Sequence, residues 1–141
     1  LTPERTELMN QMAFEVTLSQ PFETAQERVI EALKQEGFGV LTRIDVHDTL
    51  KAKLGVDFRE YAILGACNPP LAHKALSNRP DAGLMLPCNV IVEAVEGGTL
   101  VRIVDPHAMM AAGGFEDDPA LQEVGSEAAE RLRRVADSLA G

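Results

Sequence analysis

Residues 84–104 have the sequence LMLPCNVIVEAVEGGTLVRIV, the part of the chain with the clearest strand pattern. Apolar residues alternate along this stretch on both sides of Gly97-Gly98, a glycine pair typical of a hairpin turn. We therefore predict strands over 84–93 and 99–104. The two strands must run antiparallel, because a turn this short joins only antiparallel strands.

The first of these strands has one apolar face and one mixed face. The apolar face carries alternate residues, namely Leu84, Leu86, Cys88, Val90 and Val92. Pro87 lies on the mixed face and cannot donate a ladder hydrogen bond. We therefore expect a sheet edge or a β-bulge at Pro87.

Before the hairpin, strands alternate with helices. Period-2 patterns predict strands over 12–18, 38–46 and 57–66. Capping residues and apolar stripes predict helices over 21–36, 47–55 and 69–79. In the strand over 38–46, we expect Val40 and Ile44 on the apolar face and Asp45 on the opposite face.

After the hairpin, residues 105–118 contain Pro106, two glycines and an acidic run, which predict a connecting loop. Residues 119–139 then show the apolar spacing of a helix, with Glu127–Arg131 and Glu130–Arg134 as expected i,i+4 ion pairs. The apolar stripe of this helix consists of Leu121, Val124, Ala128, Leu132, Val135 and Leu139. It should pack on the sheet or on a partner chain.

These elements predict an α+β fold in one domain over 1–141, since 141 residues are enough to bury one core. An antiparallel sheet of about five strands would be packed by two or three helices. The predicted order is strand-helix-strand-(short helix)-strand-helix-strand-strand-helix. The apolar stripe of the last helix and the expected sheet edge at Pro87 also indicate a homodimer.

Charge and composition narrow the classes of partner. Lys and Arg number 13 against 22 Asp and Glu, so the formal net charge is −9, which repels nucleic-acid phosphates and anionic lipids. With no Trp and one Tyr, aromatic platforms for stacking bases are missing. No apolar run reaches the roughly 18 residues of a membrane span. Two cysteines are too few for a disulfide framework, so we expect a cytoplasmic protein. From its charge and composition we expect it to bind neither nucleic acid nor membrane.

Several separated motifs resemble those of one known family. They are Pro21-Phe22, Glu36-Gly37-Phe38-Gly39-Val40-Leu41, Leu54-Gly55-Val56-Asp57-Phe58, Cys67-Asn68-Pro69, Leu86-Pro87-Cys88-Asn89-Val90 and Asp105-Pro106. Over nearly all of 14–107 the chain is similar to the bacterial and archaeal family DUF302, a domain of unknown function. The resemblance implies a fold of the TATA-binding-protein class, a curved antiparallel sheet packed by helices, and it brings no activity. The family-like core would be 12–107, followed by the loop over 105–118 and the helix over 119–139.

The two cysteines are the first candidates for chemistry. Cys67 is expected just before the helix over 69–79, where the positive end of the helix dipole favours a thiolate. Cys88 is expected in the apolar row of its strand, and the two thiols could meet if the strands that carry them are neighbours. The structural alternative for both is packing, because free cysteine behaves as a small buried hydrophobe.

Polar residues complete the set of candidates. Asp45 is either an acid or base beside a thiol or an acceptor of a backbone hydrogen bond at the turn into the short helix. Asn68 is explained as a helix N-cap, and it is also a candidate ligand-binding residue together with Asn89 and Tyr61.

No metal site and no cofactor are predicted. His47, His73 and His107 are not spaced from one another, or from a cysteine, as ligand pairs would be. We expect His47 at a solvated helix start and His73 on the surface of its helix.

Two functions from different classes stay open. The first is a non-catalytic module that binds a small molecule or a partner through a sheet face or a groove, which needs no special residues. The second is a thiol-dependent enzyme, or a redox or sulfur sensor, that uses Cys67 with Cys88 as its resolving partner. The sequence favours the first and leaves catalysis undecided.

Overall fold

The structure is a computed structural model that describes residues 12–141. One antiparallel sheet contains β1 (Ala13–Leu18), β2 (Gly39–Asp45), β3 (Tyr61–Cys67), β4 (Cys88–Val95) and β5 (Gly98–Val104). The strand order across the sheet is β1-β5-β4-β3-β2. The α+β class, the five antiparallel strands and the β4–β5 hairpin predicted from the sequence are confirmed.

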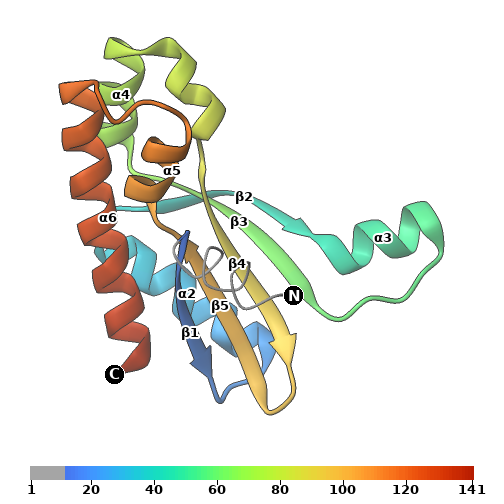
Figure 1. The fold of residues 1–141 in the computed structure, drawn as a ribbon. Helices are drawn as coiled ribbons and strands as arrows, with labels where there is room; N and C mark the ends of the chain where they lie inside the picture. Colours follow the sequence, from blue (N-terminus) through green and yellow to red (C-terminus); the bar gives the residue numbers. More distant parts are fainter. Residues whose placement is uncertain (1–11) are drawn as a thin grey trace.

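The helices fall into three groups (Figure 1). They are α2 (Phe22–Gln35), α3 (Val46–Leu54), α4 (Pro69–Asn78), α5 (Pro106–Ala112) and α6 (Pro119–Ala140), with a 3₁₀ helix η1 (Pro80–Met85). The sheet is covered by α2 and α6, which also contact each other. At the end of the sheet where β3 stops and β4 begins lie α4, η1 and α5, whereas α3 stands apart beyond the other end of β2.

The core lies between the sheet and the pair α2 and α6. On the sheet it consists of alternate residues of three strands, Ala62, Leu64, Ala66, Val90, Val92, Val101 and Ile103, all with no exposed surface. The register places Leu64 opposite Val90 and Val90 opposite Ile103, so their side chains form one apolar row across the strands. All six residues of the predicted α6 stripe are buried, which confirms that periodicity located this helix correctly.

A β-bulge in β2 changes which side chains face the core. The register steps from Val40 directly to Thr42, so Leu41 is an extra residue that turns every later side chain to the opposite face. Ile44 therefore lies on the outer face of the sheet and is 49% exposed. Asp45 lies opposite a buried residue of β3, on the helix-bearing face. The expected placement of Ile44 and Asp45 was wrong for this reason.

The segment before β4 is not a strand. Residues 80–85 form η1, the Leu86-Pro87 peptide is cis, and β4 starts only at Cys88. Leu84, expected on the apolar face, is 88% exposed. Pro87 precedes a strand that lies between β3 and β5, so the expected sheet edge or bulge at this residue was wrong.

The predicted loop over 105–118 contains a helix. Asp105 caps α5, because its Oδ1 accepts a hydrogen bond from the His107 backbone N at 2.9 Å, and Pro106 occupies the first helical position. The Ala- and Met-rich residues that follow have high helix propensity. Only 113–118 connects α5 to α6 without regular structure.

Both features that indicated a homodimer are accounted for within one chain. The apolar stripe of α6 packs on the chain's own sheet and on residues of α4 and α5. The strand after Pro87 has a neighbour on each side.

No helix within residues 12–141 has both the length and the apolar composition to cross a lipid bilayer.

Glu93 of β4 carries a buried charge on the outer face of the sheet. Its Oε1 accepts from Arg102 Nη1 at 2.8 Å and its Oε2 pairs with Arg59. Burial alone would raise the pKa of Glu93, but the hydrogen bonds from Arg102 and Arg59 hold this pKa below its usual value of 4.5. A lowered folded-state pKa stabilises the fold above about pH 4.5, and this contribution disappears as the pH falls through the folded value.

We expect Glu93→Gln to lower the free energy of unfolding at pH 7 by about 1–3 kcal/mol, because two guanidinium groups lose a charged acceptor. The difference from the unsubstituted chain should shrink as the pH falls below 4.5. Urea denaturation between pH 7 and pH 3 measures both effects, with the exposed hairpin residue Glu96 changed to Gln as the control. Equal losses for the two variants would contradict this account of Glu93.

Candidate functional site

A pocket lies where β3 ends and β4 begins, enclosed by α4, η1, α5 and α6. Its space, including the open mouth and the solvent in it, is about 600 Å³. Most of its wall is apolar. The lining residues are Phe38, Ala66, Cys67, Asn68, Leu71, Ala72, Ala75, Ala82, Met85, Leu86, Cys88, Val104, Pro106, Met109, Met110, Val124 and Ala128.

Local sequence explains why the chain opens a pocket here. After Cys67, Asn68 caps α4 with its Oδ1, which accepts from the Leu71 backbone N at 3.3 Å. This cap turns the chain away from the sheet, so α4 forms a wall rather than extending β3. The opposite wall is α5, held close to α6 because Gly125 has no side chain: a Cβ there would lie 3.0 Å from Met110 Cγ.

The two cysteines line this pocket together. Ala66 lies directly opposite Cys88 in the register of β3 and β4, and Cys67 is the next residue of β3. Both cysteines are free and half-buried. The sequence-based idea that they come from neighbouring strands holds, because β3 and β4 are paired.

Burial controls the chemistry of Cys88. Desolvation, with a smaller contribution from the charge of Cys67, raises the pKa of Cys88 to about 11. At neutral pH this residue is therefore a thiol, and a thiol is a poor nucleophile.

The helix beside Cys67 offers no hydrogen-bond donor to a thiolate. Pro69 and Pro70 have no backbone N–H, Leu71 N donates to the Asn68 side chain, and Ala72 N donates to the Asn68 carbonyl oxygen at 2.9 Å. All four N-terminal residues of α4 are thereby without a free N–H. The N-terminus of α4 therefore does not stabilise a Cys67 thiolate by donating backbone hydrogen bonds to it.

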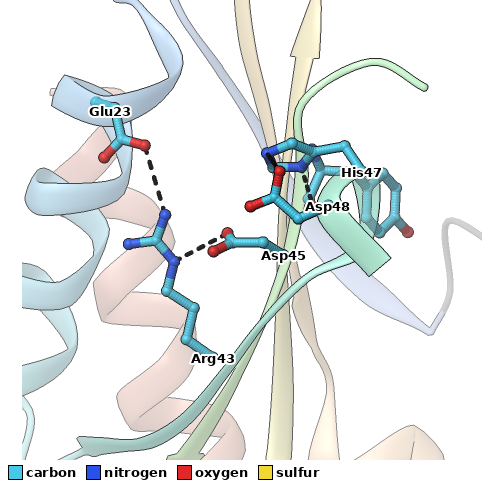
Figure 2. Close-up of polar contacts among 6 residues, drawn as sticks. Glu23, Arg43, Asp45, His47 and Asp48 are labelled. Carbon is cyan, nitrogen blue, oxygen red and sulfur yellow. Dashed lines mark hydrogen bonds and ion pairs between the residues drawn. The ribbon is translucent and has the colours of Figure 1, made fainter. Parts of the chain in front are cut away.

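Asp45 belongs to a different cluster at the far end of β2 (Figure 2). Its Oδ1 accepts from Arg43 Nε at 3.0 Å, and Arg43 Nη2 also donates to Glu23 of α2 at 3.4 Å. Gly39, at the opposite end of β2, is the residue paired with Cys67. The structure therefore does not bring Asp45 near either thiol. Asp45 occupies the N-cap position of α3, yet its side chain makes no capping bond.

His47 lies next to this cluster and is fixed by the backbone. Its Nδ1 accepts from Tyr61 N at 3.0 Å, and its Nε2 lies 3.8 Å from Asp48 Oδ1. The side chain is 20% exposed, so it is less solvated than expected. Across residues 12–141, no three His, Cys, Asp or Glu side chains gather as a metal site of those ligands would.

Two other sequence candidates lie away from the pocket. Asn89 is exposed and lies opposite Gly65 on the outer face of the sheet. Tyr61 starts β3, at the opposite end from Cys67, and its ring packs edge-on against Phe58 with centroids 6.1 Å apart. Of the six candidate residues, the structure brings together Cys67, Cys88 and Asn68.

Sequence reasoning missed the methionines of the pocket. Met85 lies in η1, at a position predicted as strand, and Met109 and Met110 lie in α5, within the predicted loop. The Asp-Pro pair before Met109 is an N-cap followed by a first-turn proline, so it was the available signal for α5.

We expect Cys88 to be alkylated very slowly at neutral pH. On a Cys67→Ser background, where Cys88 is the only thiol, desolvation alone still raises the pKa of Cys88 above its ordinary value, so very little thiolate is present at pH 7. The iodoacetamide rate should rise about tenfold per pH unit up to roughly pH 10. Mass spectrometry of timed samples measures it, and a rate that levels off below pH 9 would contradict the assigned burial.

Comparison with known proteins gives a family and no activity. The profile of a family described as a domain of unknown function, DUF302, matches residues 14–139. A crystal structure of an uncharacterized conserved DUF302 protein from Bacillus stearothermophilus is similar, with a TM-score of 0.79 and 34% sequence identity, covering 89% of this chain and 96% of that chain. No functionally curated protein matches. The match includes α5 and α6, beyond the motifs recognised in 14–107, and the chain therefore belongs to the DUF302 family.

Proposed function

We propose that the chain is a non-catalytic module that binds a small ligand in the pocket between α4, η1, α5 and the ends of β3 and β4. One observation carries this proposal: the pocket is open to solvent and its wall is mostly apolar, as in small-molecule sites. Asn68 and the two cysteines supply a few polar atoms to its wall, which is the usual composition of such sites.

A non-catalytic role is supported by what surrounds the pocket. Among residues 12–141, no Asp, Glu, His, Lys or Arg belongs to its lining. A general acid or base must come within hydrogen-bond reach of the reacting group. Cys88 is a neutral thiol, and Cys67 receives no N–H from α4.

The second candidate function is a thiol-dependent enzyme or a redox or sulfur sensor. It is favoured by one observation, the presence of both cysteines in a single pocket. In that function Cys67 would be the attacking thiolate and Cys88 the resolving thiol. A homodimer also stays a prediction, and sedimentation velocity measures it directly.

The proposed function is tested by titrating the protein with N-phenyl-1-naphthylamine, a neutral apolar dye whose fluorescence increases in an apolar environment. We expect saturable binding of one dye per chain. Ala72 is half-buried in α4 and lines the pocket, so Ala72→Phe should fill the space and weaken binding about tenfold or more. Ala52→Phe adds the same side chain on exposed α3 and should leave the affinity unchanged.

The outcomes separate the two candidate functions. Dye binding that is absent, or equal in the two phenylalanine variants, would remove the proposed ligand site. Thermal unfolding of both variants shows whether they are folded. If Cys67 reacts with iodoacetamide at pH 6 much faster than a free thiol, the enzyme or sensor is favoured instead.

A further inference from the structure

Sulfur is concentrated in the pocket to an unusual degree. The chain has five Met and two Cys. Met9 lies outside the described residues, and Met12, just before β1, is 45% exposed. Every sulfur-bearing residue after Met12 lines the pocket: Cys67, Met85, Cys88, Met109 and Met110. They arrive from β3, η1, β4 and α5, so no single element forces them together.

Packing alone explains why methionine or leucine lines an apolar cavity. It does not explain why thiols and thioethers line the same cavity. Thiolate and thioether ligands are soft, and they select soft cations, above all Cu(I). Imidazole and carboxylate groups are harder ligands, and within residues 12–141 none of them lines the pocket. Structural zinc takes four ligands from Cys, His, Asp and Glu, and this pocket supplies only two.

We propose that the pocket binds one Cu(I) ion through the sulfurs of Cys67 and Cys88, with Met85 or Met109 as a further thioether ligand. This inference rests on the proposed function, since it names the ligand of the same pocket. The pocket supports it, because Cys67 and Cys88 both line it although they come from two neighbouring strands. Two cysteines and a methionine in one cavity wall are the soft ligands that Cu(I) selects.

The charge balance of the binding step is simple. Cu(I) and two thiols give one Cu(I)–dithiolate, which carries a net charge of −1, and two protons pass to solvent. No electron is transferred, so no oxidant or reductant is consumed. Without a cation, two thiolates in an apolar pocket would repel each other and lose hydration. The ion removes this repulsion, and proton release makes the affinity rise with pH.

The test is an anaerobic titration with Cu(I) in competition with bathocuproine disulfonate, whose copper complex is coloured. We expect one Cu(I) per chain. Cys67→Ser and Cys88→Ser should each weaken binding about 100-fold or more, and Met85→Leu with Met109→Leu together about tenfold. Met12→Leu, outside the pocket, is the matched control and should bind like the unsubstituted chain.

The leucine variants keep the apolar volume, so they stay informative even if a serine variant fails to fold. Absence of Cu(I) binding, undiminished binding by the serine variants, or tighter binding of Zn(II) would overturn the inference. If the unsubstituted chain binds the dye but not Cu(I), the copper inference is overturned and the proposed function is not. If it binds neither the dye nor Cu(I), the proposed function is overturned as well. Dye binding that is blocked by one equivalent of Cu(I) supports the copper inference and the proposed function.

Discussion

Replacing Gly98 with alanine should lower the free energy of unfolding by about 3 kcal/mol or more. Gly98 is the first residue of β5, and the end of β1 lies very close to it. A Cβ there would lie 2.1 Å from the carbonyl oxygen of Leu18 and 3.3 Å from Ser19 Cα. These are backbone atoms, so no side-chain rotation relieves the clash, and β1 must separate from β5.

Urea denaturation followed by circular dichroism measures this effect. Gly39→Ala is the matched control, because Gly39 is the first residue of β2 and an added Cβ there meets no atom within 4 Å. The control should change the unfolding free energy by less than about 0.5 kcal/mol. Equal midpoints for the two variants would contradict the described packing of β1 on β5.

The second large effect is expected for Leu132→Ala in the middle of α6. Leu132 has no exposed surface and belongs to the core formed by α2, α6 and the sheet. Removing three buried carbons leaves a cavity in a region fixed on several sides, which costs about 3–4 kcal/mol.

Leu54→Ala on α3 removes the same atoms from a side chain that is 68% exposed, so it should cost less than about 1 kcal/mol. Urea midpoints of the two variants, compared at equal slope, give the difference. A loss under 1 kcal/mol for Leu132→Ala would mean that α6 does not cover the sheet in solution.

Strong periodicity made some elements predictable from the sequence. The α6 stripe repeats over five turns, and every member is buried. The β4–β5 hairpin followed from Gly97, which adopts a φ of +83° that glycine tolerates best. In both cases the local pattern and the final packing require the same residues.

Other elements depended on tertiary contacts that no local pattern shows. The bulge at Leu41 adds one residue with no Gly or Pro at positions 40–42, yet it moves Ile44 and Asp45 to the opposite faces of the sheet. Residues 84–87 alternate like a strand by coincidence, because Leu84 belongs to η1 and is exposed. Pro106 was interpreted as a loop signal, although proline is also typical of the first residue of a helix.

The candidate site was predictable only where sequence neighbours stayed together. Cys67 and Asn68 are adjacent, and Cys88 joins them because β3 pairs with β4. The part of the pocket lining formed by Met85 and Met109 could not be predicted, because it depends on how η1 and α5 pack near the strand ends.

The most direct test of the ligand pocket is protection of Cys67 from alkylation. In a Cys88→Ser chain, Cys67 is the only thiol, half-buried in the pocket lining. Its iodoacetamide rate is measured with and without saturating N-phenyl-1-naphthylamine. A ligand seated in the pocket should slow the reaction about fivefold or more, because it covers the sulfur. An unchanged rate at full dye occupancy would contradict the placement of the binding site in this pocket.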